Sequence, residues 1–205
     1  TGSNNTKEAL RLTKFAKDAG ASAALLITPY YNKPTAAGQI AHYTKIAEEV
    51  DIPIILYNVP GRTGTNILPE TVAALSKVKN IVAIKEASGS VDQTSQILSL
   101  CDITVMSGDD SLTLPLMAVG ATGVISVAAN VVPAQMAKLC AAFDKGNLAE
   151  AQKTHYELMP LFKALFIETN PMPVKAALAR MGMIENVLRL PLTPMQPQTF
   201  AQLEA

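Results

Sequence analysis

Lys85 stands at the end of the apolar run Ile81–Ile84 and is followed directly by Glu86. An ammonium group in that position loses part of its hydration, and desolvation lowers the pKa of a lysine because it disfavours the charged form. The neutral amine can attack a carbonyl carbon and form a Schiff base. The structural alternative is an ion pair between Lys85 and Glu86 at the rim of a sheet, and the sequence leaves both interpretations open.

Two further side chains suit the same chemistry. Tyr57 also follows an apolar run, and a phenol close to an ammonium can carry protons to and from a carbinolamine. Arg62 comes after Pro60-Gly61, a dipeptide typical of a tight turn, and its guanidinium fits a carboxylate in a bidentate manner. Each has a plainer alternative: a ring that packs at the rim for Tyr57, and a surface ion pair for Arg62.

The residues that precede these side chains form short runs rich in Ile, Val, Leu and Ala, without polar alternation. Such runs are typical of strands in a parallel sheet that is covered on both faces. The intervals between the runs leave room for one crossover helix each. We expect five strands, at Ala23–Pro29, Pro53–Pro60, Ile81–Ser88, Ile103–Asp110 and Gly123–Ala129.

Helices are expected before, between and after these strands. Asn5 with Glu8 forms a capping-box pattern, and Gly20 is suited to end the helix that follows. The expected helices are Thr6–Ala19, 36–50, Pro69–Lys77, 90–100 and Ser111–Gly120, then Pro133–Lys145, Ala149–Ile167, Pro173–Met181 and Gln198–Leu203.

The order of these elements predicts an α/β fold. A helix before the first strand suggests a (β/α)8 TIM barrel that is incomplete here, with strands 4–8 in residues 1–130 and a C-terminal helical region in residues 131–205. A small, complete doubly wound sheet is the alternative that periodicity leaves open. In either fold the reactive residues lie beyond the C-terminal ends of the strands, and Lys85, Tyr57 and Arg62 all fall there.

The composition excludes several classes of function. Of 205 residues, 49% are hydrophobic, and 17 Lys and Arg balance 17 Asp and Glu. A chain without net positive charge lacks the basic surface that nucleic acids require, so we expect no nucleic-acid partner. No apolar run is long enough to span a membrane, and we expect no membrane association.

The metal-ligating residue types are sparse and scattered. Cys101 and Cys140 form no Cys-x-x-Cys pair, and His42 and His155 lack the spacing of metal ligands. Asp109-Asp110 could bind a metal, although an acidic pair more often caps the next helix. We therefore expect no metal site and no disulfide framework, and a cytoplasmic location as the default.

Six segments, in order along the chain, resemble the dihydrodipicolinate synthase family, within the N-acetylneuraminate lyase group of class I aldolase-like barrels. They are Thr28–Pro34, Tyr57–Gly64, Ile84–Gly89, Ser107–Asp110, Gly123–Ser126 and Asn170–Lys175. The arginine of Gly61-Arg62-Thr63 favours the synthase branch of this group over the sialic-acid lyase branch.

The resemblance implies a reaction that needs no cofactor. Lys85 would form a covalent imine with pyruvate, and the resulting enamine would attack aspartate semialdehyde to give 4-hydroxy-tetrahydrodipicolinate, on the route to lysine. Tyr57 would relay protons, and Arg62 would hold the carboxylate of the semialdehyde. Gly108 and Ile125 match positions that line the pyruvate pocket.

The resemblance also implies self-association and regulation. Tyr31 matches a tyrosine that family members lend to the proton relay of a neighbouring subunit, so we expect contact between copies through the surface of Tyr30 and Tyr31. In members inhibited by lysine, the allosteric site includes positions that match Ser3, Asn4, Glu8 and Tyr30.

One part of the family pattern is not in this sequence. Family members begin with βα units that carry a Gly-Thr-Thr-Gly-Glu motif, whose threonines bind the pyruvate carboxylate and complete the proton relay. We therefore expect impaired turnover from the 205-residue chain by itself. The alternatives are a non-catalytic fragment or assembly remnant, and a pyruvate-dependent aldolase of the same family with another aldehyde acceptor; Arg62 and the Tyr30-Tyr31 pair favour the synthase over the last.

Overall fold

The computed structural model describes residues 1–204, which form two compact units. The first unit comprises Thr1–Ile125, and the second begins at Ser126. The sequence predicted a division between residues 130 and 131, and the division in the structure lies a few residues earlier. All the candidate site residues belong to the first unit.

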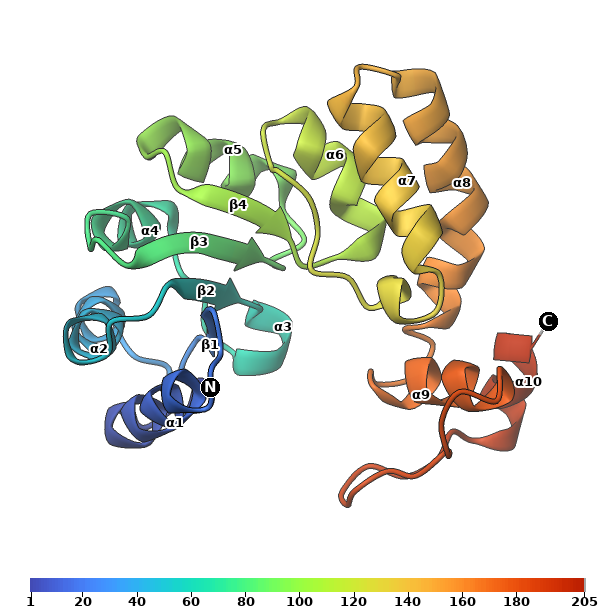
Figure 1. Ribbon diagram of the computed structural model, residues 1–205, viewed down its shortest axis with the longest axis horizontal. Helices are drawn as coiled ribbons and strands as arrows, with labels where there is room; N and C mark the ends of the chain where they lie inside the picture. Colours follow the sequence, from blue (N-terminus) through green and yellow to red (C-terminus); the bar gives the residue numbers. More distant parts are fainter. Residues whose placement is uncertain (205) are drawn as a thin grey trace. The chain divides into compact units, whose positions relative to one another are not determined.

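The first unit contains a parallel sheet of four strands in the order β1-β2-β3-β4 (Figure 1). The strands are β1 (Ala24–Ile27), β2 (Ile54–Asn58), β3 (Ile81–Glu86) and β4 (Thr104–Ser107). Each lies inside one of the first four predicted runs, so the prediction of a parallel α/β sheet is confirmed. Because the strands are parallel, their C-terminal ends meet at one edge, where Tyr57 and Lys85 lie side by side.

The prediction of a fifth strand over Gly123–Ala129 is wrong for the described residues. Pairing beyond β4 is limited to one bridge, between Ser107 and Val124, with hydrogen bonds from Ser107 N to Gly123 O (2.8 Å) and from Ile125 N to Ser107 O (2.9 Å). The chain then turns into the short 3₁₀ helix η2 (Ala128–Asn130), and the Ser126 hydroxyl accepts a hydrogen bond from the N–H of Ala129 (2.8 Å). A side-chain oxygen that bonds the nearby backbone in this way competes with a strand ladder.

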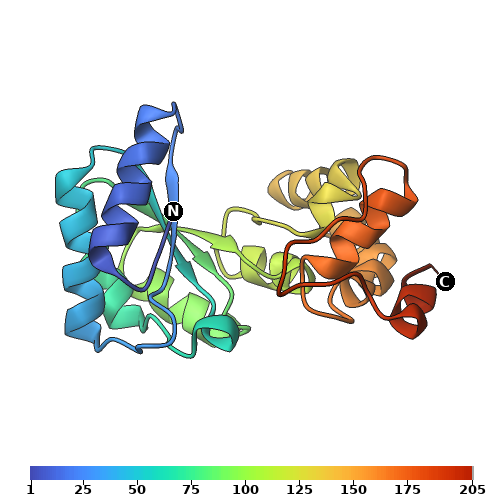
Figure 2. The same ribbon diagram turned by 90° about the horizontal axis from the view of Figure 1, so that it is seen from below.

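The helices of the first unit follow their predicted positions closely. They are α1 (Thr6–Asp18), α2 (Ala36–Glu49), α4 (Pro69–Leu75), α5 (Val91–Leu100) and α6 (Thr113–Ala118), the last preceded by the 3₁₀ turn η1 (Asp110–Leu112). Adjacent members of this series contact one another, and Figures 1 and 2 show α1, α2, α4 and α5 along one face of the sheet.

The capping box predicted for α1 forms only in part. The Asn5 side chain accepts a hydrogen bond from the N–H of Glu8 (3.2 Å), as an N-cap does. The Glu8 carboxylate does not return to the N–H of Asn5, because it accepts from the Ser3 hydroxyl instead (2.5 Å). The N–H of Asn5 donates to that same hydroxyl (3.2 Å), so Ser3 stands between the two partners of the box.

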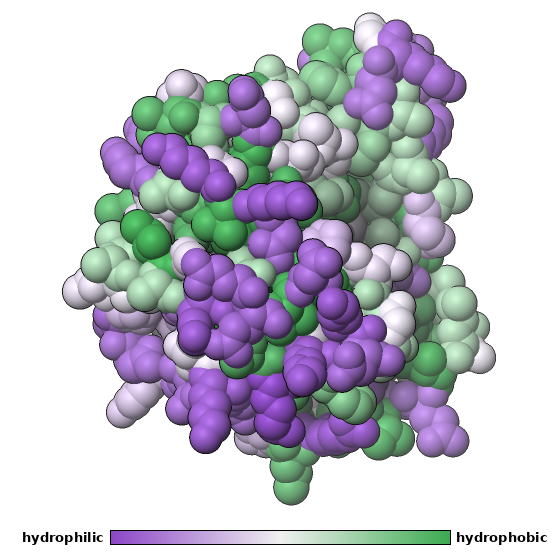
Figure 3. Space-filling model, turned by 60° about the vertical axis from the view of Figure 1, so that its left-hand side comes forward, coloured by the Kyte–Doolittle hydropathy of each residue, from purple (hydrophilic) through white to green (hydrophobic). Residues whose placement is uncertain are grey.

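The sheet buries one face more deeply than the other, contrary to the expectation of two equally covered faces. Along β2, Ile54, Leu56 and Asn58 are buried, whereas Ile55 and Tyr57 are half-buried. The helices line the buried face, where strand residues pack against side chains of the helices. The core includes Leu26, Ile46, Ile54, Leu56, Val72, Ile84, Ile97 and Val105. Figure 3 shows one face of the molecule, on which hydrophilic and hydrophobic residues are interspersed, as expected where amphipathic helices meet solvent.

One helical turn was not predicted. The Pro60-Gly61 dipeptide, expected as a tight turn, begins the short helix α3 (Pro60–Thr63). Pro60 occupies the first turn, where its missing N–H costs nothing, and Gly64 ends the helix in the left-handed conformation (φ 73°). Arg62 therefore sits on a helical turn directly after β2.

The second unit is helical, as predicted. It contains α7 (Pro133–Asp144), α8 (Leu148–Ala164), α9 (Met172–Arg180) and α10 (Pro197–Glu204), and α7 packs against α8. A small cluster of Met172, Ala176 and Met195 is covered by Leu188, Leu192, Phe200 and Leu203. Within residues 1–204, no helix combines the length and apolar character that crossing a membrane demands.

Candidate active site

The side chains of Lys85 and Tyr57 meet at the C-terminal edge of the sheet. The two residues are register partners on adjacent parallel strands, so their side chains project from the same face. The Lys85 Nζ atom lies over the Tyr57 ring, 4.2 Å from its centroid. This distance is within the range of a cation–π contact, and it brings an amine and a phenol together as the sequence predicted.

Burial favours the neutral form of the Lys85 amine. Desolvation is the largest influence on Lys85 and lowers its pKa; the Arg62 charge acts in the same direction, while Asp109 and Asp110 oppose it. A lower pKa increases the fraction of neutral amine, which is the nucleophilic form. The alternative interpretation, an ion pair with Glu86, is not what the structure contains: the ion pairs found within residues 1–204 involve neither residue.

The phenol of Tyr57 is held in its protonated form. Desolvation raises its pKa, Asp109 adds to that effect, and Arg62 opposes it. A phenol that keeps its proton at neutral pH can donate it to a carbinolamine oxygen beside Lys85.

Asp109 also belongs to this site, although the sequence favoured a capping role for it. Its side chain makes no cap hydrogen bond to η1. Burial raises its pKa, the Asp110 carboxylate raises it further, and Lys85 lowers it. The signal that could have identified it is its position after β4, one strand beyond Lys85.

Gly108 allows the Lys85 side chain to approach the backbone. A Cβ atom on Gly108 would lie 2.5 Å from the Ala87 Cβ and 3.1 Å from the Lys85 Cε. The N–H of Gly108 donates to the Glu86 carbonyl (2.7 Å), which fixes the strand ends together. Ile125 is bonded to Ser107 at the same edge. Both positions thus lie beyond the C-terminal end of β4, and their part in a pyruvate pocket stays a prediction.

Arg62, Tyr30 and Tyr31 line a different hollow, of about 810 Å³, together with Lys33 and the turn 61–64. The N–H of Tyr31 donates to the Thr63 carbonyl (3.2 Å), joining the two loops. Tyr31 has a positive φ of 71° and its side chain is 88% exposed, while Tyr30 is 41% exposed. Sequence analysis did not single out Lys33, a second cation in this hollow, although it lies within the Thr28–Pro34 motif.

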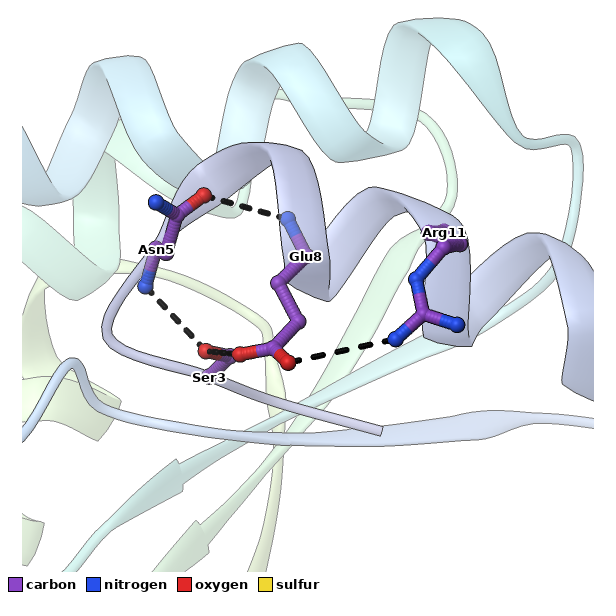
Figure 4. Close-up of polar contacts among 4 residues, drawn as sticks. All are labelled: Ser3, Asn5, Glu8 and Arg11. Carbon is purple, nitrogen blue, oxygen red and sulfur yellow. Dashed lines mark hydrogen bonds and ion pairs between the residues drawn. The ribbon is translucent and has the colours of Figure 1, made fainter.

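The residues expected to bind lysine form a polar cluster at the start of α1, drawn in part in Figure 4. Glu8 accepts from Ser3 and lies 3.9 Å from the Arg11 guanidinium. The Asn4 amide donates to the Tyr30 carbonyl (3.2 Å), which links this cluster to the tyrosine loop. A hollow of about 750 Å³ borders the cluster, lined by Asn5, Lys7, Glu8, Leu10, Arg11, Lys14, Glu49 and Val50.

A second polar group that sequence analysis missed lies behind the strands. Asn58 and Glu86, the residues after Tyr57 and Lys85, are register partners whose side chains are hydrogen-bonded to each other (3.1 and 3.3 Å). Their adjacency to Tyr57 and Lys85 was the available signal. Across residues 1–204, no three His, Cys, Asp or Glu side chains are grouped as a metal site would need.

An amine of lowered pKa, a protonated phenol and a guanidinium follow neighbouring strands at one edge of a parallel sheet, an arrangement suited to an enzyme site. The pattern of the Dihydrodipicolinate synthetase family matches residues 1–205. The chain belongs to this family.

Relatives and solved structures agree with that assignment. The chain is 56% identical to the 4-hydroxy-tetrahydrodipicolinate synthase of Methanothrix thermoacetophila, over 99% of this chain and 70% of the relative. It superimposes on the dihydrodipicolinate synthase of Thermotoga maritima with a TM-score of 0.97 and 50% identity, over 99% of this chain and 71% of the other. The chain thus spans about 70% of the length of the proteins it matches.

Two solved relatives contain small molecules. The chloride-inhibited dihydrodipicolinate synthase of Acinetobacter baumannii is complexed with pyruvate; it is 47% identical, with a TM-score of 0.97, over 100% of this chain and 71% of the other. The enzyme of Cyanidioschyzon merolae has lysine bound; it is 43% identical, with a TM-score of 0.96, over 99% of this chain and 70% of the other.

Proposed function

We propose that the chain carries the Schiff-base centre of a 4-hydroxy-tetrahydrodipicolinate synthase, a lyase of lysine biosynthesis, with Lys85 as the nucleophile. The observation that carries the proposal is the position of the Lys85 amine, desolvated and 4.2 Å from the Tyr57 ring centroid at the edge of the sheet. The pyruvate complex of the Acinetobacter baumannii relative supports a 2-keto acid as the first substrate.

The reaction follows from the two side chains. The neutral amine of Lys85 adds to the keto carbon of pyruvate, the carbinolamine oxygen takes a proton from Tyr57 and leaves as water, and an iminium remains. The Tyr57 phenolate then takes a methyl proton, which gives the enamine. The enamine carbon bonds to the aldehyde carbon of aspartate semialdehyde, and the aldehyde oxygen takes the proton back from Tyr57 to become a hydroxyl. The amino group of that substrate then attacks the imine carbon, which closes the ring and releases the Lys85 amine. No cofactor takes part, since every bond change is a polar addition or elimination.

Arg62 is proposed to hold the carboxylate of the semialdehyde. Its guanidinium can form two parallel hydrogen bonds to a carboxylate. Lys33 lines the same hollow and adds positive charge to it. These two cations favour an acceptor that carries a carboxylate over a neutral aldehyde, which supports the synthase reaction over an aldolase with another acceptor.

The sheet is proposed to be an arc of a (β/α)8 barrel, of which β1–β4 are four strands, with a single further bridge from β4 to Val124. A parallel sheet lined by helices on one face supports this, as does the 70% share of the relatives that the chain spans. For the chain taken by itself, the same 70% share favours a second candidate function, a fragment without turnover.

Contact between copies and binding of lysine are further parts of the proposal. The exposed Tyr31 ring suits insertion into a second copy, with Tyr30 beside it. The cluster of Ser3, Asn4, Glu8 and Tyr30 suits the ammonium and carboxylate groups of a free amino acid, and the Cyanidioschyzon merolae relative has lysine bound. A cytoplasmic location fits the two free cysteines, Cys101 and Cys140.

Borohydride trapping with pyruvate tests the proposal. We expect an adduct by intact mass, mapped by peptide analysis to the segment that holds Lys85. Omission of pyruvate, and substitution of the half-exposed Lys45 of α2 by alanine, are the controls, and the second should leave the adduct unchanged. A folded sample that yields no adduct at Lys85 would contradict the proposal, and steady-state turnover then separates the enzyme from the fragment.

A further inference from the structure

We infer that the buried carboxylate of Glu86 is a positioning residue, which holds Lys85 and Tyr57 at their reactive separation through Asn58 and Gln93. The inference deepens the proposed function and rests on it for the identity of the nucleophile. Glu86 is 1% exposed. Its carboxylate accepts hydrogen bonds from the Ser88 N–H (2.7 Å), from the Asn58 amide (3.1 and 3.3 Å) and from the Gln93 amide (3.3 Å).

Asn58 joins β3 to β2 at this point. It is fully buried, and its amide donates both to Glu86 and to the Asn66 side chain (2.7 Å). Its side-chain oxygen accepts from the Ile67 N–H (3.0 Å), and its backbone carbonyl accepts from the Ala87 N–H (2.9 Å). One side chain therefore fixes the end of its own strand, the end of the next strand and the loop that follows α3.

Gln93 closes the network from α5. Besides its bond to Glu86, it exchanges hydrogen bonds with Asn66 (2.7 and 3.2 Å). The Asn66 carbonyl in turn accepts from Gln39 of α2 (3.1 Å). Two helices, two strand ends and one loop are thus tied together by side-chain amides around a single carboxylate.

Because strand residues alternate between the two faces of the sheet, this network also fixes the positions of the residues on the reactive face. Asn58 and Glu86 directly follow Tyr57 and Lys85 and project from the opposite face of the sheet. A shift or twist of either strand end, caused by loss of a bond behind the sheet, moves the amine relative to the phenol in front of it. A displacement of about 1 Å at a reactive group can cost about 10²-fold in rate.

The chemistry of the network indicates a role beyond stability. A buried charge is costly to desolvate, and an apolar side chain of similar volume is often as stable or more so. Within residues 1–204, the ion pairs present leave Glu86 out, so amide and backbone donors alone satisfy its charge. Such an arrangement gives geometric definition, because its three donors, Asn58, Ser88 and Gln93, come from β2, from the loop after β3 and from α5.

The first test compares Glu86→Gln with Thr94→Val, a control at a buried polar residue of α5 whose hydroxyl donates to the Ser90 carbonyl, outside the network of Glu86. Trace acetylation of the free protein across pH, read by peptide mapping, reports the titration of Lys85 without pyruvate. We expect Glu86→Gln to raise the Lys85 midpoint toward that of an ordinary lysine, by on the order of one pH unit, because a loosened strand end rehydrates the ammonium. Thr94→Val should leave the midpoint unchanged.

Gln93→Ala provides a milder variant in case Glu86→Gln does not fold, and it should shift the midpoint in the same direction by less. An unchanged midpoint in a folded Glu86→Gln or Gln93→Ala protein would overturn the inference.

Borohydride trapping of pyruvate separates this result from failure of the proposed function. Under the inference, Glu86→Gln slows adduct formation by about tenfold or more while Thr94→Val does not. If the unsubstituted chain forms no adduct but its Lys85 midpoint still shifts in Glu86→Gln, the proposed function fails and the positioning role stands.

Discussion

Two pairs of residues occupy the same strand ends and face opposite ways. Tyr57 and Lys85 are half-buried, contact each other through a ring and an amine, and have pKa values shifted mainly by desolvation. Asn58 and Glu86, one position further along each strand, are fully buried and meet hydrogen-bond donors and acceptors from several elements. Tyr57 and Lys85, the front pair, thus keep hydrogen-bonding capacity, whereas the hydrogen-bonding capacity of Asn58 and Glu86, the back pair, is used by protein groups.

The difference shows how one sheet edge supplies both reactivity and rigidity. A group whose hydrogen-bonding capacity is fully used by the protein cannot bind a substrate. A desolvated amine, by contrast, is free to form a bond to a carbonyl carbon. Because the residues alternate in β2 and β3, the rigid pair lies directly behind the reactive pair. Substitutions in front should therefore change chemistry at constant stability, and those behind should change both.

Substitution of the nucleophile has the largest expected effect. Lys85→Ala should abolish adduct formation with pyruvate, because no other amine lies at this edge among the sequence-predicted site residues. The free energy of unfolding should change little, since the amine is desolvated at a cost to stability. Intact mass after borohydride treatment measures the first quantity and urea denaturation the second. Persistence of the adduct in Lys85→Ala would show that another residue is the nucleophile.

Removal of the phenol hydroxyl comes next. Tyr57→Phe keeps the ring under the Lys85 amine but removes the proton donor, so the rate of imine formation should fall by about 10²- to 10⁴-fold. Tyr156→Phe, at an exposed tyrosine of α8, is the matched control. Rapid-quench borohydride trapping gives both rates. Equal rates in the two variants would remove Tyr57 from the relay.

The sequence predicted the reactive pair because the position of a residue after an apolar run is a local property. It could not predict that Glu86 bonds to Asn58 and Gln93 instead of pairing with Lys85, because partner choice depends on what the strand and helix register brings together. The alternation of strand residues did contain the hint, since neighbours in a strand point to opposite faces.

Two backbone features differ from the sequence-based prediction, each for its own reason. A proline fits the first turn of a helix as well as a tight turn, and Gly64 ends the short helix α3 in the left-handed conformation. The run Gly123–Ala129 has the composition of a strand, but it bonds to β4 only at its beginning before η2 begins. Strand formation requires a continued partner, which composition alone does not reveal.

A methyl group added at Gly108, next to the Lys85 side chain, should have a smaller effect than the two substitutions above. In Gly108→Ala, the new methyl group would meet the Ala87 Cβ at 2.5 Å and the Lys85 Cε at 3.1 Å, so the strand end must shift. We expect a loss of about 1–3 kcal/mol in the free energy of unfolding, typical of overpacking, and slower imine formation. Gly61→Ala, where a Cβ would meet nothing, is the control. Urea titrations that show equal stability for both variants would contradict the expected contact.

The smallest predicted effect is that of Asp109→Asn. It distinguishes a carboxylate that acts on Lys85 through its charge from one that acts through its position. The Asp109 carboxylate raises the pKa of Lys85, against the desolvation that lowers it. In Asp109→Asn this opposing charge is lost, so the Lys85 midpoint in trace acetylation should move down. Glu86→Gln is expected to move the same midpoint up, because that carboxylate acts through geometry. Asp102→Asn, at an exposed aspartate before β4, should leave it unchanged. Shifts of the same sign in Asp109→Asn and Glu86→Gln would mean that both carboxylates act on the amine in one way, and the contrast between the two faces of the sheet would not hold.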